Sequence, residues 1–261
     1  MRQIRRVKRV VIKVGTAVIT ENDGSLKAGY FSSIAKQISY LRDKGVEVVL
    51  VSSGAIGAGM SELKLKTKIR GTIMEQVCAS VGQSVLIDKY RKAFNRNKIK
   101  VSQLLLTRNV FENKKSFINL KNCTEQLLKM KIVPIINEND VVAVDEIGEN
   151  FGDNDYLSSL IAINLKADML IMLSRVDGIY TQNPEKNKGS MRILEVNKIT
   201  KEVEKYASGK SRLGRGGMKS KISAAKNCTK SGIDMVILGG NDKKVILNLF
   251  NGEDVGTYFY S

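Results

Sequence analysis

Short apolar runs alternate along the chain with longer segments in which apolar residues recur every three or four positions. Such runs, bounded by glycine or polar clusters, are typical of buried β-strands, and the longer pattern is typical of amphipathic helices. The pattern predicts strands at 7–14, 47–51, 99–106, 132–136, 168–173, 234–238 and 256–260. It predicts helices at 28–44, 117–130, 155–165, 201–206 and 245–249, one or two helices within 69–97, and one that ends near 231.

The order of these elements is strand, then helix, along nearly the whole chain. This order favours an α/β fold with a mainly parallel sheet covered by helices on both faces. No long linker, repeat or low-complexity tract divides the 261 residues, so we expect a single domain with two lobes, about 1–166 and about 167–261. The polar segment 107–115 is expected to be a flexible loop, and 140–148 a hairpin.

The absence of histidine limits the chemistry that the chain can perform. It excludes Ser-His-Asp and Cys-His triads and histidine-ligated metal sites, so lysine, aspartate, asparagine, serine and backbone amides must carry any reaction. The formal net charge of +17 admits a nucleic-acid partner. However, the basic residues are spread over the whole length, and aromatic residues make up only 6% with no tryptophan, so nucleic-acid binding is disfavoured.

Cysteine usage and the N-terminus indicate a cytoplasmic protein. Cys78, Cys123 and Cys228 are odd in number, far apart and in helix-like segments, which indicates core thiols in a reducing compartment. The N-terminus is basic and then apolar, but its apolar part is short, contains Lys13 and lacks a cleavage site, so it is interpreted as a first strand. No apolar run is long enough to span a bilayer, and no membrane association is expected.

Two polar clusters lie at the ends of predicted elements. Asn137-Glu138-Asn139-Asp140 follows the strand at 132–136, and Gly152-Asp153-Asn154-Asp155 opens the helix at 155–165. In open α/β sheets, ligands bind outside the carboxyl ends of the strands. The alternative is that these residues only form turns, with Asp153 or Asp155 capping the helix. Two such clusters on either side of one short polar segment favour a shared ligand site.

Other segments are suited to binding an anion. Lys13 lies inside the apolar first strand, where a charge is costly without an anionic partner, and Gly15-Thr16 follow it; an edge lysine that reaches solvent is the alternative. The strand at 47–51 leads into the small residues 52–59, which would present backbone N–H groups at the start of a helix.

The glycine-rich segment 213–221 also opens a helix. Its spacing does not match the P-loop or the dinucleotide-binding fingerprint. It is interpreted as a glycine loop at a helix start, with Lys221 one turn in and directed back toward a bound phosphate. A flexible glycine turn with a solvated lysine is the alternative.

Five segments occur in order: Lys13-Val14-Gly15-Thr16, Ser53-Gly54-Ala55-Ile56, the Ile-Asn-Glu-Asn-Asp of 136–140, the Gly-Asp-Asn-Asp of 152–155, and Gly216-Gly217-Met218-x-x-Lys221. Together they resemble the amino acid kinase family, and within it the glutamate 5-kinases, over nearly the whole chain. The lysine start and the glycine loop are shared broadly with relatives. The pair of Asn/Asp clusters is more specific.

This resemblance implies a three-layer αβα sandwich that transfers a phosphoryl group from ATP, with Mg²⁺, to the side-chain carboxylate of L-glutamate. The product would be glutamyl 5-phosphate, in the first step of proline biosynthesis. The resemblance also implies a homo-oligomer, feedback inhibition by proline, and a short form without the C-terminal RNA-binding-like (PUA) domain that many members carry.

The resemblance further assigns roles to residues of this sequence. Lys13 and Lys221 would neutralise the transferring phosphoryl group, and Asp155 would hold both lysines. The implied glutamate-binding residues are Ser53, Gly54, Asp140 and Asn154. The implied ATP-binding residues are Lys13, Ser174, Arg175, Arg215, Gly216, Gly217, Met218, Lys219, Ser220 and Lys221. No protein ligand for a resident metal is implied.

One departure from the family pattern is Arg175, where many members carry aspartate. Alternatives within the family are acceptors such as N-acetylglutamate, aspartate, carbamate or a nucleoside monophosphate. Asp140 favours an acceptor with a free ammonium group. From a different class, the chain would be a basic RNA-binding protein without catalysis.

Overall fold

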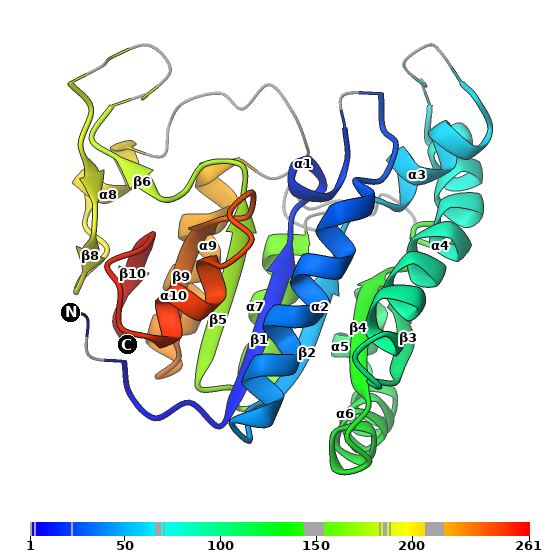
Figure 1. Cartoon of the computed structure of the whole chain (residues 1–261), viewed down its shortest axis with the longest axis horizontal. Coiled ribbons are helices and arrows are strands. Elements are labelled where there is room, and N and C mark those ends of the chain that lie inside the picture. Colours follow the sequence, from blue (N-terminus) through cyan, green and yellow to red (C-terminus); the bar gives the residue numbers. More distant parts are fainter. Residues whose placement is uncertain are drawn as a thin grey trace.

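The computed structural model shows a central β-sheet with helices on both faces (Figure 1). It describes residues 2, 4–21, 23–65, 69, 71–143, 154–182, 184, 187, 189–206 and 217–261. Among these residues, eight strands form the main sheet in the order β3-β4-β2-β1-β5-β9-β10-β8. The predicted α/β fold with a mainly parallel sheet and a helical layer on each side is confirmed.

Six strands of the sheet are parallel to one another. They are β1 (Arg9–Val14), β2 (Glu47–Ser52), β3 (Val101–Leu106), β4 (Val133–Glu138), β5 (Met169–Ser174) and β9 (Asp234–Gly239). At one edge, β10 (Thr257–Phe259) runs antiparallel to β9, and β8 (Glu195–Val196) pairs in parallel with β10. A separate antiparallel pair consists of β6 (Ile179–Tyr180) and β7 (Arg192–Ile193).

Strand β1 lies in the middle of the sheet, between β2 and β5. The chain builds one half of the sheet from β2, β3 and β4 and then crosses over β1 to build the other half from β5 and β9. This reversal is a topological switch point, and the carboxyl ends of the strands around it are where open α/β sheets bind ligands.

The helices form one layer on each face of the sheet. One face packs against α2 (Ala28–Asp43), α4 (Thr72–Asn95) and α10 (Val245–Phe250), and the other against α6 (Lys114–Lys129), α7 (Asn154–Asn164) and α9 (Met218–Lys230). In Figure 1, α2 and α10 lie in front of the sheet and α7 and α9 behind it. The other helices of the described residues are α1 (Thr16–Ile19), α3 (Ala55–Glu62), α5 (Asn109–Glu112) and α8 (Lys201–Tyr206).

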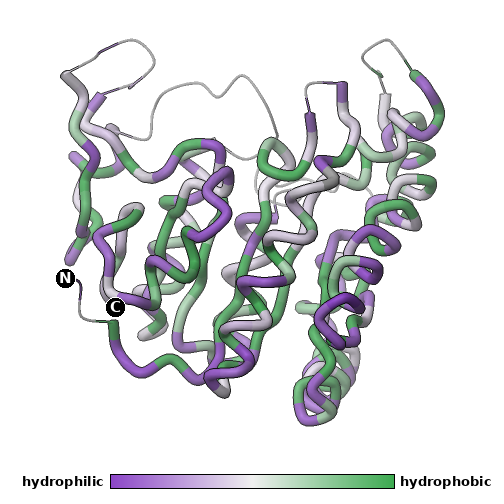
Figure 2. The backbone as a smooth tube through the Cα atoms, viewed as in Figure 1, coloured by the Kyte–Doolittle hydropathy of each residue, from purple (hydrophilic) through white to green (hydrophobic). Residues whose placement is uncertain are grey.

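Alternation along the strands divides the apolar side chains between two cores. In β1, Val10, Ile12 and Val14 belong to the core under α2 and α4, whereas Val11 belongs to the core under α7 and α9. Successive side chains of a strand point to opposite faces, so Lys13 shares the face of Val11. Figure 2 shows hydrophobic strands in the sheet, and helices on which hydrophobic and hydrophilic residues alternate.

Most predicted elements are present within a few residues of their expected bounds. The described part of 69–97 contains one long helix, α4, after a separate α3. The prediction of a flexible loop at 107–115 was wrong, because α5 lies within it and α6 begins at Lys114. The hairpin predicted at 140–148 lies largely outside the described residues. No helix in the described part of the chain is long and apolar enough to cross a membrane.

Candidate active site

Lys13 lies near the carboxyl end of β1, in the most protected part of the sheet. It pairs in register with Val51 of β2 and Met172 of β5, and it is only 5% exposed. Because β1 is a central strand, the Lys13 side chain cannot reach solvent at an edge of the sheet, and the alternative of an edge lysine is wrong. The Lys13 ammonium instead meets a carboxylate, because its Nζ lies 2.5 Å from Oδ1 of Asp155.

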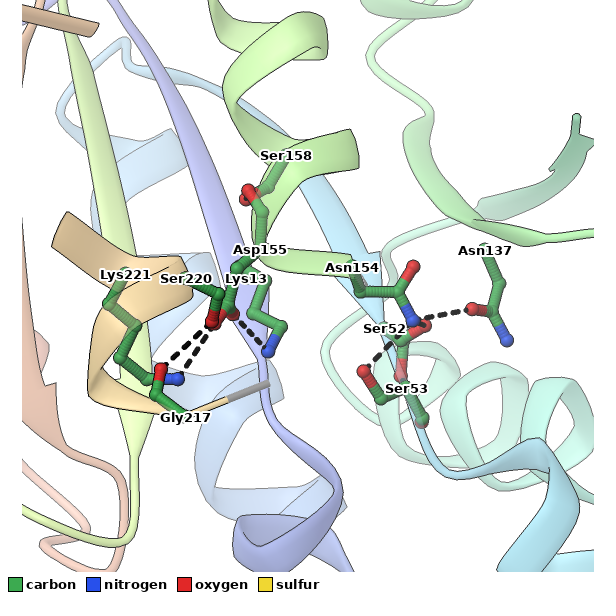
Figure 3. Close-up of polar contacts among 10 residues, drawn as sticks. All are labelled: Lys13, Ser52, Ser53, Asn137, Asn154, Asp155, Ser158, Gly217, Ser220 and Lys221. Carbon is green, nitrogen blue, oxygen red and sulfur yellow. Dashed lines mark hydrogen bonds and ion pairs between the residues drawn. The ribbon is translucent and has the colours of Figure 1, made fainter. Parts of the chain in front are cut away.

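Asp155 lies in the first turn of α7 and is fully buried. Its Oδ2 accepts hydrogen bonds from Lys221 Nζ at 2.8 Å and from Ser220 Oγ at 2.7 Å. One carboxylate therefore lies between two ammonium groups, one from strand β1 and one from a helix more than 200 residues further along the chain (Figure 3). Asp155 is not the cap of this helix, because it follows Asn154 inside α7 and its side chain points to these lysines, whereas Asp153, the other candidate for the cap, lies outside the described residues.

The energetics of this cluster depend on its complete pairing. Burial alone would raise the pKa of Asp155, but the charges of Lys13 and Lys221 outweigh burial and hold that pKa well below its ordinary value. Removing one partner of a buried ion pair leaves an uncompensated charge and costs about 3–5 kcal/mol. Two lysines and one aspartate leave a net positive charge, which suits a site that receives an anion.

Lys221 is placed by the start of α9. This helix begins at Met218, and Gly217 precedes it with an extended backbone. Lys221 lies on the buried face of α9 with Ile222 and Ala225, and it is 6% exposed. Helices α7 and α9 pack against each other on the same face of the sheet, and this packing places Lys221 against Asp155.

A second polar group lies at the carboxyl ends of β2 and β4. The amide nitrogen of Asn154, the residue before Asp155, donates to Ser53 Oγ at 2.9 Å and to Asn137 Oδ1 at 3.0 Å. Asn154 and Asp155 point away from each other, Asn154 toward Ser53 and Asp155 toward the lysines (Figure 3). The first turn of α7 therefore connects two polar groups.

The turn after β2 has a conformation that requires glycine. Gly54 has φ of +101°, and a Cβ there would lie 2.7 Å from Cδ1 of Ile19. Helix α3 begins at the next residue, Ala55. Gly54 thus turns the chain sharply, so that Ser53 and the amino end of α3 both lie at the carboxyl edge of the sheet.

Asn137 is a site residue to which sequence reasoning assigned no role. It is 4% exposed, and its Oδ1 accepts from Asn154 and also from the backbone N–H of Glu138 at 2.9 Å. The signal was available, because Asn137 opens the polar cluster after β4. Asp140 lies in the turn just beyond β4 and is half-buried.

The residues assigned to ATP are only partly brought together. Ser174 ends β5, and its carbonyl accepts from the N–H of Gly240 at 2.8 Å, so it lies at the carboxyl edge of the sheet. Arg175 follows it and is exposed. The side chains of Met218 and Lys219 are outside the lysine cluster, because Met218 packs against the core and Lys219 is exposed. Arg215 and Gly216 lie outside the described residues.

The described residues contain no group of three or more histidine, cysteine, aspartate or glutamate side chains that could hold a metal ion. In kinase sites Mg²⁺ is usually bound by one or two carboxylates together with the phosphates of the nucleotide and water. Asp155 accepts from two ammonium groups and a hydroxyl, so a magnesium ion would come with the nucleotide as part of the substrate.

Comparison with known proteins identifies relatives over the whole length. The model of the "Amino acid kinase family" matches residues 8–239. Glutamate 5-kinase from Clostridium perfringens is 44% identical over 255 residues, which cover 97% of this chain and 95% of that protein. Glutamate 5-kinase from Lactiplantibacillus plantarum is 43% identical over 264 residues, which cover 99% and 100%.

Solved structures of lower identity share the fold. Carbamate kinase from Giardia lamblia bound to AMP-PNP superposes with a TM-score of 0.68 at 17% identity, covering 98% of this chain and 99% of that one. UMP kinase from Bacillus anthracis superposes with a TM-score of 0.65 at 19% identity, covering 98% and 97%. These likenesses establish the architecture of the sheet and its two helical layers.

Proposed function

This chain belongs to the amino acid kinase family, and we propose that it transfers the γ-phosphoryl group of ATP to the side-chain carboxylate of L-glutamate. The product is glutamyl 5-phosphate, as formed in the first step of proline biosynthesis. The observation that carries this proposal is the first turn of α7. There Asn154 bonds to Ser53 while its neighbour Asp155 binds Lys13 and Lys221.

The chemistry of the acceptor fits the residues that are present. The side-chain carboxylate of glutamate has a reference pKa of about 4.3, so it is already an ionised nucleophile at neutral pH. The reaction needs no general base, and a chain without histidine can perform it. What the site must supply is positive charge, since phosphoryl transfer depends mainly on positioning and on charge neutralisation.

Lys13 and Lys221 supply this charge in the proposed mechanism. Both ammonium groups are buried against Asp155, so they are fixed before the substrates arrive and need little rearrangement during the reaction. Asp155 holds the two like charges close together. The lysines neutralise the phosphoryl group as it passes from ADP to the glutamate carboxylate.

The acceptor is assigned to the polar group on the other side of the first turn of α7. Ser53, Gly54 and Asn154 lie at the carboxyl ends of β2 and β4 and would orient glutamate through hydrogen bonds. Asp140, in the turn after β4, would bind the ammonium group of the substrate. An acceptor without a free ammonium group could not form this ion pair.

ATP, with its magnesium ion, is assigned to the half of the sheet beyond β1. The start of α9, from Gly217 to Lys221, would approach the phosphates together with Arg215 and Gly216, and Ser174 and Arg175 after β5 would complete the site. Residues 1–166 would therefore bind glutamate and residues 167–261 the nucleotide. The proposal includes a homo-oligomer, inhibition by proline and a reducing cytoplasmic setting; the free thiols of Cys78, Cys123 and Cys228 fit that setting.

A hydroxylamine trap for the acyl phosphate tests the proposed reaction. The protein is mixed with ATP and Mg²⁺, and with L-glutamate, N-acetylglutamate or aspartate in parallel reactions. Hydroxamate formed only with glutamate is the expected result. Hydroxamate formed with N-acetylglutamate instead would overturn the role of Asp140, but it would not affect the role proposed for the two lysines. No product with any acceptor would contradict the kinase assignment, and RNA would be the next ligand to test.

A further inference from the structure

Within the described part of the chain, two hydrogen bonds reach Oδ2 of Asp155, and both donors come from the first turn of α9. One is the ammonium group of Lys221, which the proposed mechanism uses. The other is the hydroxyl of Ser220, at 2.7 Å. The family pattern places Ser220 only within a nucleotide-binding segment, and the mechanism gives its side chain no task.

The Ser220 hydroxyl has one hydrogen and two acceptors within reach. Oδ2 of Asp155 lies 2.7 Å from its oxygen, and the carbonyl oxygen of Gly217 lies 2.8 Å away. A serine hydroxyl can donate only once at a time. A hydrogen bond to an ionised carboxylate is roughly twice as strong as one to a neutral carbonyl, so the hydrogen points to Asp155.

This hydrogen bond complements the ion pair beside it. Lys221 reaches Asp155 through a flexible four-carbon chain, whereas Ser220 reaches it through a single carbon. The short serine side chain therefore constrains the carboxylate directly against the backbone of α9. The orientation of this carboxylate determines where Oδ1 lies, and Oδ1 is the atom that holds Lys13.

We propose that Ser220 is a positioning residue for phosphoryl transfer, whose hydroxyl fixes the Asp155 carboxylate and, through it, both lysines. Its side chain then makes no hydrogen bond to the nucleotide. This inference rests on the proposed kinase function. Without the hydroxyl, the Asp155 carboxylate can rotate, so the two ammonium groups are no longer held in fixed positions. The contacts of the α9 backbone to the nucleotide remain.

The test compares Ser220→Ala and Ser220→Cys, which lack a strong donor, with Ser220→Thr, which keeps the hydroxyl. A hydrogen bond to a charged group has an effect of about ten-fold or more, so kcat for glutamyl hydroxamate should fall about ten-fold in the alanine and cysteine variants. The threonine variant should stay within about two-fold of wild type, and the Kd for ATP, measured by calorimetry, should change by less than about two-fold in all three variants.

Ser158→Ala is the matched control. Ser158 is also buried and also bonds to Asp155, but its hydroxyl donates to the main-chain carbonyl within α7 at 2.7 Å. Its removal should lower thermal stability and leave kcat unchanged. An equal loss of kcat in Ser158→Ala would show that the effect reflects weaker packing of α7, and would overturn the inference.

Three other outcomes would also overturn it. They are a raised Kd for ATP with unchanged kcat, failure of threonine to rescue, and full activity of both the alanine and the cysteine variants. If one of these two variants does not fold, the other carries the comparison with threonine. Wild-type protein that forms no hydroxamate contradicts the proposed function, whereas active wild type with equally active variants contradicts only the role of Ser220.

Discussion

Replacing Gly82 with alanine should displace the glutamate side of the site without touching it. Helix α4 packs closely on α3 through small residues. A Cβ on Gly82 would lie 1.8 Å from the carbonyl oxygen of Ala55 and 2.5 Å from the backbone nitrogen of Gly59, and Cβ atoms essentially never come closer than 3.0 Å to such atoms. Both obstacles are backbone atoms of α3, so the helix itself must move.

The size of the effect follows from these distances. The two helices must separate by about 1 Å, and a misplacement of about 1 Å in a reacting geometry can cost about 10²-fold in rate. Overpacking costs about 1–3 kcal/mol, and the better helix propensity of alanine returns up to about 1 kcal/mol of it. We therefore expect a net destabilisation of about 1–2 kcal/mol.

The displacement has a direction that can be measured. The nearest clash of the new Cβ is with Ala55, the first residue of α3, and Ser53 lies two positions before it. Steady-state hydroxamate formation should therefore show kcat/KM for glutamate falling by about 10²-fold. The KM for ATP should stay near that of wild type, because the assigned nucleotide residues lie on β1 or beyond it.

Gly29→Ala provides the matched control. Gly29 lies in α2, is exposed, and would find no atom within 4 Å of a new Cβ. The same chemical change should raise the free energy of unfolding by about 0.5–1 kcal/mol and leave both KM values unchanged. A folded Gly82→Ala protein with normal kcat/KM for glutamate would refute this reasoning, as would an equal loss for glutamate and ATP.

Further predictions concern single side chains. Lys13→Ala and Lys221→Ala should each lower kcat by about 10²-fold or more, and near-normal turnover in both would contradict their role. Asp140→Asn should raise the KM for glutamate about ten-fold, and a change confined to ATP would oppose it. Asp155→Asn should lower kcat with an unchanged circular dichroism spectrum. Because the lysines depress the pKa of Asp155, its stabilisation is complete above the unfolded value near 3.8 and is lost as pH falls below it. Wild type should therefore lose thermal stability more steeply below pH 4 than this variant, and equal slopes would refute the linkage. Lys131→Gly should raise the free energy of unfolding by up to about 1 kcal/mol in chemical denaturation, because Lys131 has φ of +57°; a loss of stability would contradict this.

The local pattern of the sequence was sufficient to predict that Lys13 lies in a buried strand, but it did not predict which carboxylate pairs with it. The apolar neighbours of Lys13 predicted a buried strand, and the structure places it in the centre of the sheet. Periodicity carries no information about contacts between distant segments, and Asp155 and Lys221 come from helices far along the chain. Only the order of motifs suggested that the three meet, and their catalytic roles stay predictions.

The wrong prediction at 107–115 shows how polar composition can hide a helix. Asn113 was treated as part of a loop, yet its Oδ1 accepts from the backbone N–H of Ser116 at 3.0 Å and so caps α6. Asparagine is among the preferred capping residues, so the signal was present. The helix that follows is basic and polar in its first turn, and it gave no apolar period to mark its start.

Several helices end without the glycine that usually marks a helix end, although the ends expected at 130 and 165 were within one residue of the observed ones. The four non-glycine residues with positive φ in the described part of the chain are all lysines, and each follows a helix: Lys64, Lys98, Lys131 and Lys166. Glycine is the usual residue at this position, because it adopts positive φ without steric cost. A lysine there gives no local signal for the end of a helix, so these ends had to be predicted from where the apolar period stops.

The charge on Asp155 determines which group can control the reaction at low pH. A general base must accept a proton near the working pH, but the lysines hold the pKa of Asp155 well below its ordinary value, so it stays anionic through turnover. The attacking carboxylate of glutamate, with a reference pKa of about 4.3, loses its charge first as the solution is acidified. As pH falls, the decrease in kcat/KM should therefore follow protonation of the glutamate carboxylate and not protonation of Asp155. Asp155 acts by keeping two like charges together, and a group with that task is useful only while it does not titrate.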